Sequence, residues 1–266
     1  MTVRVALTIA GSDSSGGAGI QADLKTFAAL GVYGASAITA VTAQSTIGVV
    51  EAAVLSADLV TAQIEAVAGD IGIHAVKTGM LGDAAVVEAV AAAIRELELP
   101  LVVVDPVLAS SSGACLLDDD GLQMLCVRLL PLARVVTPNI PEAEVLTGTR
   151  IVSDGDLKDA ARRIHDLGAA AVIITGGHRP TGDVTDLLFD GHSFSEFRTP
   201  RVDTQHTHGT GCTFAAAIAA ELALGRSLAD AADRAQKYVA GGIQHSLAIG
   251  RGHALLDHFW GGILKR

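Results

Sequence analysis

Several familiar sequence signals are scarce or missing in this chain of 266 residues. It has three cysteines (Cys115, Cys126 and Cys212) and no Cys-x-x-Cys pair, which argues against a disulfide framework and favours a reducing compartment. It has neither a Gly-x-x-x-x-Gly-Lys-Ser/Thr motif nor a Gly-x-Gly-x-x-Gly motif, so a P-loop and a dinucleotide fingerprint are both excluded. A bound nucleotide would need another phosphate-binding element.

Long apolar runs and an excess of basic residues are also absent. Glu221 interrupts the apolar stretch 214–224, and no run reaches the ~18 apolar residues of a membrane span. The apolar stretch 5–10 lacks the flanks and cleavage site of a signal peptide. The net charge of −10 and the pI of about 5.3 argue against a nucleic-acid or membrane partner. We therefore expect a cytoplasmic protein that binds anions through local amides and Mg²⁺.

Short apolar runs alternate with segments of helical periodicity, which predicts an α/β fold with a doubly wound, mostly parallel sheet and helices on both faces. The predicted strands are 3–10, 75–77, 101–105, 135–138 and 171–175. The predicted helices are 22–30, 57–67, 84–98, 121–130, 156–167, 213–224 and 226–245, and Ser56, Asp83 and Ser153 mark the starts of three of them.

Four further segments look more like edge strands. Segments 35–43 and 49–55 predict a small edge or lid element, and segments 187–190 and 193–197 predict a hairpin. No linker, repeat or low-complexity tract separates these elements, so we expect a single domain over 1–266.

Polar or glycine-rich residues follow four of the predicted strands, at 11–13, 105–106, 137–139 and 175–177. In parallel α/β sheets ligands bind beyond the carboxyl ends of the strands. These loops therefore predict one composite cleft.

The segment from His206 to Cys212 carries the strongest functional signal. Gly209 and Gly211 let the backbone bring its N–H groups to a helix start, where unpaired amides and the helix dipole attract anions. Phosphoryl transfer needs such donors around the migrating group. Cys212 would lie at the positive end of the dipole, which favours a thiolate. Alternatively, the glycines only permit close packing and Cys212 is a small buried residue.

Three residues are candidates for a magnesium site. Asp105, Asn139 and Glu142 offer the oxygen ligands that Mg²⁺ prefers. Alternatively, Asp105 caps a loop and Glu142 only occupies the first turn of a helix, where carboxylates are favoured.

Four other polar residues each allow two interpretations. Gln44 could pair with an amine and a ring nitrogen together, or be an edge-strand amide. Lys77 could bind phosphate or a carboxylate, or extend to solvent from a strand end. His206 and His208 have no third ligand at zinc-like spacing, so loop hydrogen bonding is favoured over metal binding.

Seven segments in this order resemble the hydroxymethylpyrimidine/phosphomethylpyrimidine kinases, from about residue 5 to residue 259. They are 6–25, Thr42-Ala43-Gln44, 76–82, Asp105-Pro106-Val107, 137–144, 207–213 and Gly250-Arg251-Gly252-His253. The resemblance implies a ribokinase-like fold, ATP and Mg²⁺. It also implies two phosphorylations of 4-amino-5-hydroxymethyl-2-methylpyrimidine for thiamine synthesis.

The resemblance also assigns roles to individual residues. It implies substrate-binding residues (Gly11, Asp23, Gln44, Met80 and Val107), an anion hole with an acceptor-activating thiol (Gly209, Thr210, Gly211 and Cys212), nucleotide-binding residues (Asn139, Thr175, Gly177, Gly209 and Gly211) and magnesium ligands (Asp105 and Glu142). We also expect a homodimer, although no residue pattern fixes the oligomeric state.

The chain departs from the family pattern at Ser45, Thr175 and His206, where the family commonly has Asn, Lys and Asn. Thr175 removes a cation expected near the ATP phosphates, for which His178 or Arg179 could substitute. Three other functions stay open: a pyridoxal-type kinase, a pyrimidine-binding regulator without turnover, and a thiol hydrolase that uses Cys212 with His208.

Overall fold

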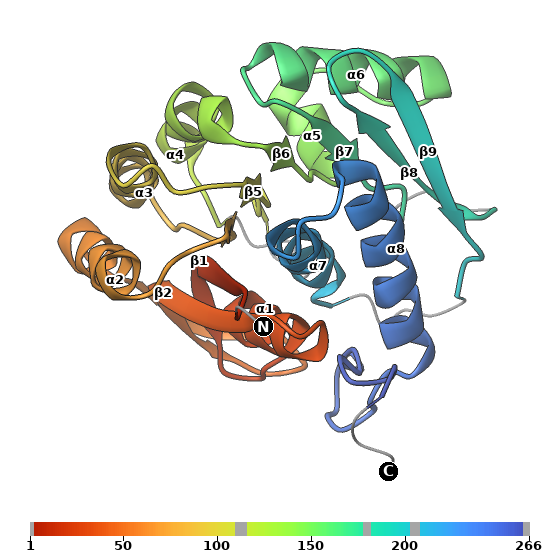
Figure 1. The fold of residues 1–266 in the computed structure, drawn as a ribbon. Coiled ribbons are helices and arrows are strands. Elements are labelled where there is room, and N and C mark those ends of the chain that lie inside the picture. The colour runs from red at the N-terminus through yellow and green to blue at the C-terminus, as the bar shows by residue number, and fades with distance from the viewer. Residues whose placement is uncertain (1–2, 110–115, 178–181, 203–207, 263–266) are drawn as a thin grey trace.

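A nine-stranded sheet forms the centre of the computed structural model, which describes residues 3–109, 116–177, 182–202 and 208–262 (Figure 1). The strand order is β3-β2-β1-β4-β5-β6-β7-β8-β9. The six strands from β2 to β7 in this order pair in parallel, while β3, β8 and β9 are antiparallel. The predicted mostly parallel sheet is therefore confirmed, with β3 as the predicted edge strand and β8–β9 as the predicted hairpin.

The strands coincide with the apolar runs of the sequence. Their bounds are β1 Val5–Asp13, β2 Tyr33–Gln44, β3 Val49–Val54, β4 Ala75–Thr78, β5 Val102–Val104, β6 Val135–Val136, β7 Val172–Ile174, β8 Val184–Phe189 and β9 Phe194–Thr199. The central strands β4 to β7 are buried along their whole length. Helices cover both faces there, which explains why these strands are continuously apolar rather than alternating.

Helices pack on both faces of the sheet (Figure 1). One face carries α1 Gly19–Ala29, α7 Thr210–Ala223 and α8 Leu228–Gln244; the other carries α2 Ala57–Asp70, α3 Ala84–Glu96, α4 Asp119–Met124, α5 Ile140–Thr147 and α6 Asp154–Asp166. Ser56, Asp83 and Ser153 each accept a hydrogen bond from the first turn of their helix, as predicted. The two faces bury separate apolar clusters.

Two elements differ from the prediction. The predicted helix 121–130 breaks into α4, a π turn at Leu125–Leu129 and a 3₁₀ turn at Leu130–Leu132, because Pro131 lacks the N–H that a regular helix needs. The predicted loop 11–13 is wrong, because β1 continues to Asp13. A bulge between Ala10 and Ser12 lets this polar end keep pairing with β2, with Asp13 opposite Thr42.

Among the described residues, none of the helices has the length and apolar character needed to cross a membrane.

Candidate active site

A cleft of about 620 Å³ opens beyond the carboxyl ends of the parallel strands. This volume is typical of small-molecule sites. Almost all predicted site residues line the cleft: Gly11, Gln44, Met80, Asp105, Val107, Asn139, Glu142, Thr175, Gly177, Gly209, Thr210, Gly211 and Cys212. The predicted composite cleft is therefore present, and loops far apart in the sequence build it.

Asp23 is the exception among the predicted substrate-binding residues. It lies on α1, is fully buried, and is not part of the cleft lining. Its Oδ2 accepts hydrogen bonds from Thr8 Oγ1 at 2.6 Å and from Lys77 Nζ at 3.0 Å. Asp23 therefore holds Lys77 from behind the cleft rather than facing it, and its predicted direct contact with substrate finds no support in this geometry.

Lys77 is a buried cation between two carboxylates. It is fully buried, and its Nζ lies 3.0 Å from Asp23 and 3.8 Å from Asp105. Burial lowers the pKa of this ammonium, but the charges of Asp23, Cys212 and Asp105 raise it above its usual range. Of the interpretations left open by the sequence, the carboxylate partner is confirmed and extension to solvent is wrong.

Asp105, directly after β5, and Glu142, in the first turn of α5, form a pair of crowded carboxyl groups. Burial raises the pKa of Asp105 to about 6, and burial together with the charge of Asp105 raises the pKa of Glu142 to about 7. Among the described residues, Asp105 Oδ2 is buried without a hydrogen-bond partner. A divalent cation would supply the missing positive charge, so these oxygens fit the predicted magnesium site.

Asn139 and Glu142 also satisfy the alternative, structural interpretation. Asn139 Oδ1 accepts from the Glu142 N–H, and Glu142 Oε2 accepts from the Asn139 N–H, both at 2.9 Å, so they close a capping box at the start of α5. The capping role fixes the glutamate at the cleft edge. The Leu108 backbone N–H also donates to this carboxylate.

The turn from Gly209 to Cys212 begins α7 at the base of the cleft. Gly209 has φ +81°, and a Cβ there would overlap the carbonyl oxygen of Gly17, so only glycine fits. The N-terminus of α7, with its dipole, therefore points its first amides into the cleft. This geometry supports the anion-site interpretation over simple helix packing.

Cys212 behaves differently from the prediction. Burial is the main cause that raises the pKa of its thiol to about 12; Asp105 and Asp23 add to this, while Lys77 and the Gly19 N–H oppose it. The thiol also donates a hydrogen bond to Asp105. This pKa disagrees with the predicted resting thiolate, because desolvation first, and then the two nearby carboxylates, favour the neutral thiol.

Val107 lines the cleft in a strained conformation. Its φ is +40°, a left-handed value that a β-branched residue rarely adopts. Such strain persists where the surroundings force it and is common at ligand sites. The observation agrees with the predicted substrate contact at Val107 without identifying the substrate.

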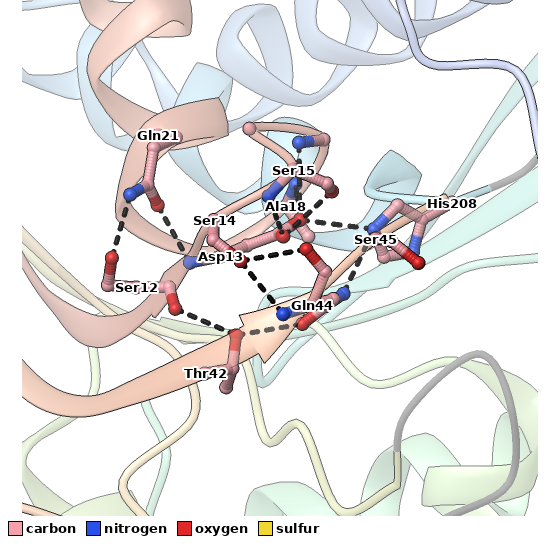
Figure 2. A network of polar contacts seen from close by, with 12 residues as sticks. Ser12, Asp13, Ser14, Ser15, Ala18, Gln21, Thr42, Gln44, Ser45 and His208 are labelled. Atoms are coloured by element: carbon pink, nitrogen blue, oxygen red, sulfur yellow. Dashed lines mark hydrogen bonds and ion pairs between the residues drawn. The ribbon is translucent and has the colours of Figure 1, made fainter. Parts of the chain in front are cut away.

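Asp13 organises the opposite wall of the cleft (Figure 2). Its two oxygens accept hydrogen bonds from Ser15 N and Oγ, from Gly17 N, from Ala18 N and from His208. Burial would raise its pKa, but these bonds, with that from His208 first, lower it to about 2. Asp13 is therefore an ionised anchor that joins the β1–α1 loop to the start of α7.

Gln44 lies beside this anchor. Its side-chain amide contacts Thr42 Oγ1 at 3.1 Å and His208 Nε2 at 3.3 Å, and it also lines the cleft (Figure 2). The interpretation of Gln44 as an amide with local partners is confirmed, and its predicted pairing with an amine and a ring nitrogen stays a prediction. The predicted loop hydrogen bonding of His208 is confirmed.

The far wall of the cleft is built by β7, β8 and the residues after β9. Asp186 Oδ1 accepts from Gly176 N at 2.8 Å and its Oδ2 accepts from Gln236 Nε2 at 2.9 Å; burial nevertheless raises its pKa to about 6. Arg201 donates to the carbonyls of Gly177 and Gly182. Within the described part of the chain, Arg201 Nη2 is buried without a partner.

Sequence reasoning missed Asp13 as an anchor, and it missed Asp186 and Arg201 entirely. Asp13 follows an apolar strand and precedes a glycine-rich loop, a pattern that could have drawn attention to it. No local pattern marks Asp186 or Arg201. Residues Cys115, His178, Arg179, His206 and Thr207 lie outside the described residues, so the proposals that involve them stay predictions.

Comparison with known proteins identifies relatives that match nearly the whole of this chain. The model of the phosphomethylpyrimidine kinase family matches residues 13–257. A hydroxymethylpyrimidine/phosphomethylpyrimidine kinase of Bacillus subtilis is 50% identical over 260 residues, 97% of this chain and 96% of that protein. A thiamine biosynthesis bifunctional protein of Geobacter sulfurreducens is 50% identical over 252 residues, and the match spans 95% of this chain but only 51% of that longer protein.

A solved structure supports the same grouping. The ADP complex of Bacillus subtilis pyridoxal kinase superposes with a TM-score of 0.90 at 38% identity, over 97% of this chain and 98% of that one. This agreement, with the observed sheet order, confirms the ribokinase-like α/β prediction. The cleft at the strand ends, the glycine turn at α7 and the near full-length match lead to one conclusion: the chain belongs to the phosphomethylpyrimidine kinase family.

Proposed function

We propose that the protein transfers the γ-phosphoryl group of ATP to 4-amino-5-hydroxymethyl-2-methylpyrimidine and then to the resulting monophosphate, in thiamine synthesis. The observation that carries this proposal is the presence of Gln44 and the Gly209–Cys212 turn in one cleft. An amide that offers a donor and an acceptor suits an aminopyrimidine edge. The helix start suits a migrating phosphoryl group.

In the first step the hydroxymethyl oxygen attacks the γ-phosphorus, the bond to the β–γ bridging oxygen breaks, and ADP leaves. The backbone amides at the start of α7 stabilise the charge on the transferred group. Cys212 would accept a hydrogen bond from the acceptor hydroxyl at its sulfur. The hydroxyl proton would pass to this sulfur while the thiol proton passes to Asp105, to which the thiol donates. Because phosphoryl-transfer transition states are loose, the hydroxyl proton leaves late and a weak base suffices. In the second step the attacking phosphate oxygen is already anionic.

Asp105 and Glu142 would hold Mg²⁺, which would neutralise charge on the phosphates when bound. Two observations support this assignment. Asp105 Oδ2 has no hydrogen bond within the described residues and has Lys77 Nζ near it, at 3.8 Å, and the pKa of both carboxyl groups is raised. Lys77 keeps Asp105 in place from the interior of the sheet.

We place the nucleotide beside Thr175, Gly177 and Arg201. Thr175 carries no charge, and the cleft lining there includes the acid Asp186, so the phosphates need a cation from elsewhere. Arg201 lines the same wall, and within the described residues its Nη2, an NH2 group, has no partner, while Nε and Nη1 donate to two carbonyls. We therefore propose Arg201 as a substitute cation; Arg179, the candidate from the sequence, lies outside the described residues. We also propose that the protein is a single-domain enzyme of the cytoplasm and that it acts as a homodimer.

A pyridoxal kinase activity is the second candidate, favoured by the likeness to the Bacillus subtilis pyridoxal kinase. Pyridoxal offers a phenol and an aldehyde beside its hydroxymethyl group, and lacks the amino-pyrimidine edge that suits Gln44. A pyrimidine-binding regulator would bind the same ring without turnover. A thiol hydrolase is disfavoured, because a thiol with a pKa of about 12 is a poor nucleophile near neutral pH.

The test supplies the purified protein with ATP, Mg²⁺ and one acceptor at a time: the pyrimidine alcohol, its monophosphate or pyridoxal. Mass spectrometry of the products should show the mono- and the diphosphate of the pyrimidine, with pyridoxal a slower acceptor. Turnover of pyridoxal alone, or binding of pyrimidine without product, would contradict the proposal. Cys212→Ala should slow the first step more than the second, because only the alcohol must lose a proton.

A further inference from the structure

The hydrogen bonds around Gln44 contain a conflict at Thr42. Thr42 Oγ1 lies 2.9 Å from the Ser12 carbonyl oxygen and 3.1 Å from Gln44 Oε1. Both of these oxygens are acceptors, whereas the hydroxyl has one proton. The Ser12 carbonyl can only accept, so it takes the Thr42 proton. The amide atom that faces Thr42 should then be a donor rather than an oxygen.

A second conflict lies at the other end of the same amide. His208 Nε2 is 3.2 Å from Asp13 Oδ2 and 3.3 Å from Gln44 Nε2. Asp13 is an ionised carboxylate near neutral pH, so His208 Nε2 must carry a hydrogen to contact it. That N–H then faces the amide nitrogen of Gln44, which is also a donor. The group that faces His208 should be an acceptor.

Figure 2 shows the amide with both conflicting contacts, and a half-turn about its terminal bond removes both conflicts at once. We propose that Asp13, His208 and Thr42 are positioning residues that hold Gln44 with Oε1 toward His208 and Nε2 toward Thr42. In this arrangement Thr42 donates to Ser12 and accepts from Gln44. His208 donates to Asp13 and lies beside the amide oxygen.

The backbone of Gln44 cannot adjust in place of its side chain. Ser14 Oγ donates to the Gln44 carbonyl at 2.7 Å and accepts from the Gln44 N–H at 2.8 Å. The strand end is therefore clamped. The orientation of the amide alone decides in which order Gln44 presents its donor and its acceptor to the cleft.

The order matters for the reaction, and this step rests on the proposed function. Around the pyrimidine ring, the amine lies between a ring nitrogen and the hydroxymethyl group. With Nε2 on the Thr42 side, Nε2 donates to the ring nitrogen on that side. The amine of the pyrimidine then donates to Oε1 on the His208 side. His208 directly precedes Gly209 in the chain, so the hydroxymethyl group extends toward the Gly209–Cys212 turn. The reversed amide would direct it away from the phosphoryl-transfer site.

Neutron diffraction of the perdeuterated, ligand-free protein tests the orientation independently of any activity. We expect two deuterons on the Gln44 atom that faces Thr42, one deuteron on Thr42 directed at Ser12, and one deuteron on His208 Nε2. Two deuterons on the amide atom that faces His208 would overturn the proposal.

A kinetic double-mutant cycle tests the consequence. Thr42→Val should raise KM for the pyrimidine alcohol roughly three- to tenfold, while Thr42→Ser should restore the parent value. In a Gln44→Ala background, Thr42→Val should have no further effect, because Thr42 acts only through that amide. An equal effect of Thr42→Val in both backgrounds would contradict the positioning role.

Thr147→Val is the matched control. Thr147 donates to a carbonyl on α5 and lies outside the network, so its loss should leave KM for the pyrimidine unchanged. If the wild-type protein fails to phosphorylate the pyrimidine, the proposed function fails. The neutron result then still decides the orientation of Gln44.

Discussion

Two buried aspartates on opposite walls of the cleft carry opposite pKa shifts. Asp13, at the end of β1, is 3% exposed, and Asp186, in β8, is 4% exposed. Burial acts on both carboxyl groups, yet the pKa of Asp13 falls to about 2 and that of Asp186 rises to about 6. Asp13 accepts from three backbone amides, a hydroxyl and a histidine, whereas Asp186 accepts from one backbone amide and one side-chain amide. Asp13 has more donors, and desolvation acts more strongly on the more deeply enclosed Asp186, so both causes separate the two pKa values.

The wall that contains Asp13 and the wall that contains Asp186 differ in how many internal hydrogen bonds hold them. The Asp13 wall is organised before any ligand binds, because its ionised carboxylate fixes the β1–α1 loop and, through His208, the region of Gln44. The Asp186 wall has fewer internal partners, and it includes Arg201 with an N–H group left for a ligand. A preorganised wall suits selection of the acceptor. A wall with unused donors suits a charged co-substrate.

The largest expected effect concerns a third carboxylate, Asp23, whose charge is balanced by a cation instead of by many donors. Lys77→Met should lower the free energy of unfolding by about 3–5 kcal/mol, because it leaves Asp23 buried without its counter-charge. Urea denaturation measures this loss.

Adding Asp23→Asn to Lys77→Met provides the control for the Lys77 prediction. The double variant should recover part of the lost stability, since it removes the uncompensated charge. If the losses in free energy of unfolding of Lys77→Met and Asp23→Asn simply add in the double variant, the two residues do not act as a charge pair.

The pH dependence of stability tests the two-wall comparison directly. Asp186 ionises less readily in the folded protein than in the unfolded chain. The contribution of Asp186 to the free energy of unfolding should therefore fall by about 3 kcal/mol as the pH rises from 4 to 7, through its raised pKa of about 6. The contribution of Asp13 changes in the opposite sense: it is present above pH 4 and is lost as the pH falls toward its lowered pKa of about 2.

The measurement is the free energy of unfolding against pH for wild type, Asp186→Asn and Asp13→Asn. Relative to wild type, the Asp186→Asn variant should gain stability between pH 4 and 7. The Asp13→Asn variant should approach wild type only below pH 4. If the free energy of unfolding, relative to wild type, changed with pH in the same direction in both variants, the proposed contrast between the two walls would be contradicted.

The next largest expected effect concerns Arg201, in the wall of the cleft that includes Asp186. Arg201→Ala should raise KM for ATP roughly tenfold or more, because a hydrogen bond to a charged phosphate is lost. KM for the pyrimidine should change little. Arg198→Ala is the matched control, since Arg198 lies on β9 but pairs with Glu196 in an exposed ion pair. Equal effects of the two substitutions on KM for ATP would show that Arg201 has no specific contact.

The sheet and most of the cleft could be predicted from the sequence because their signals are local. Apolar runs such as 102–104 mark strands wherever they lie, and strand ends in a parallel sheet meet at one edge. The resemblance to the kinase family added residue roles that stay predictions; of these residues, Asp23 is the one outside the cleft lining.

The remaining features depend on contacts between distant parts of the chain. His208 contacts Gln44 from 164 residues away and Asp13 from 195 residues away, and no spacing rule predicts such pairs. The thiolate expected at Cys212 failed for the same reason. The helix dipole is visible in the sequence, whereas the carboxylates of Asp105 and Asp23 come beside the thiol only in the folded protein.

The most direct test of the central claim, that the Asp13 wall selects the acceptor through Gln44, compares two acceptors in wild type and Gln44→Ala. We expect kcat/KM for the pyrimidine alcohol to fall ten- to a hundredfold, the equivalent of about 1–3 kcal/mol for two directed hydrogen bonds, while KM for ATP and kcat/KM for pyridoxal stay nearly unchanged. An unchanged kcat/KM for the pyrimidine, or an equal loss with both acceptors, would contradict the claim.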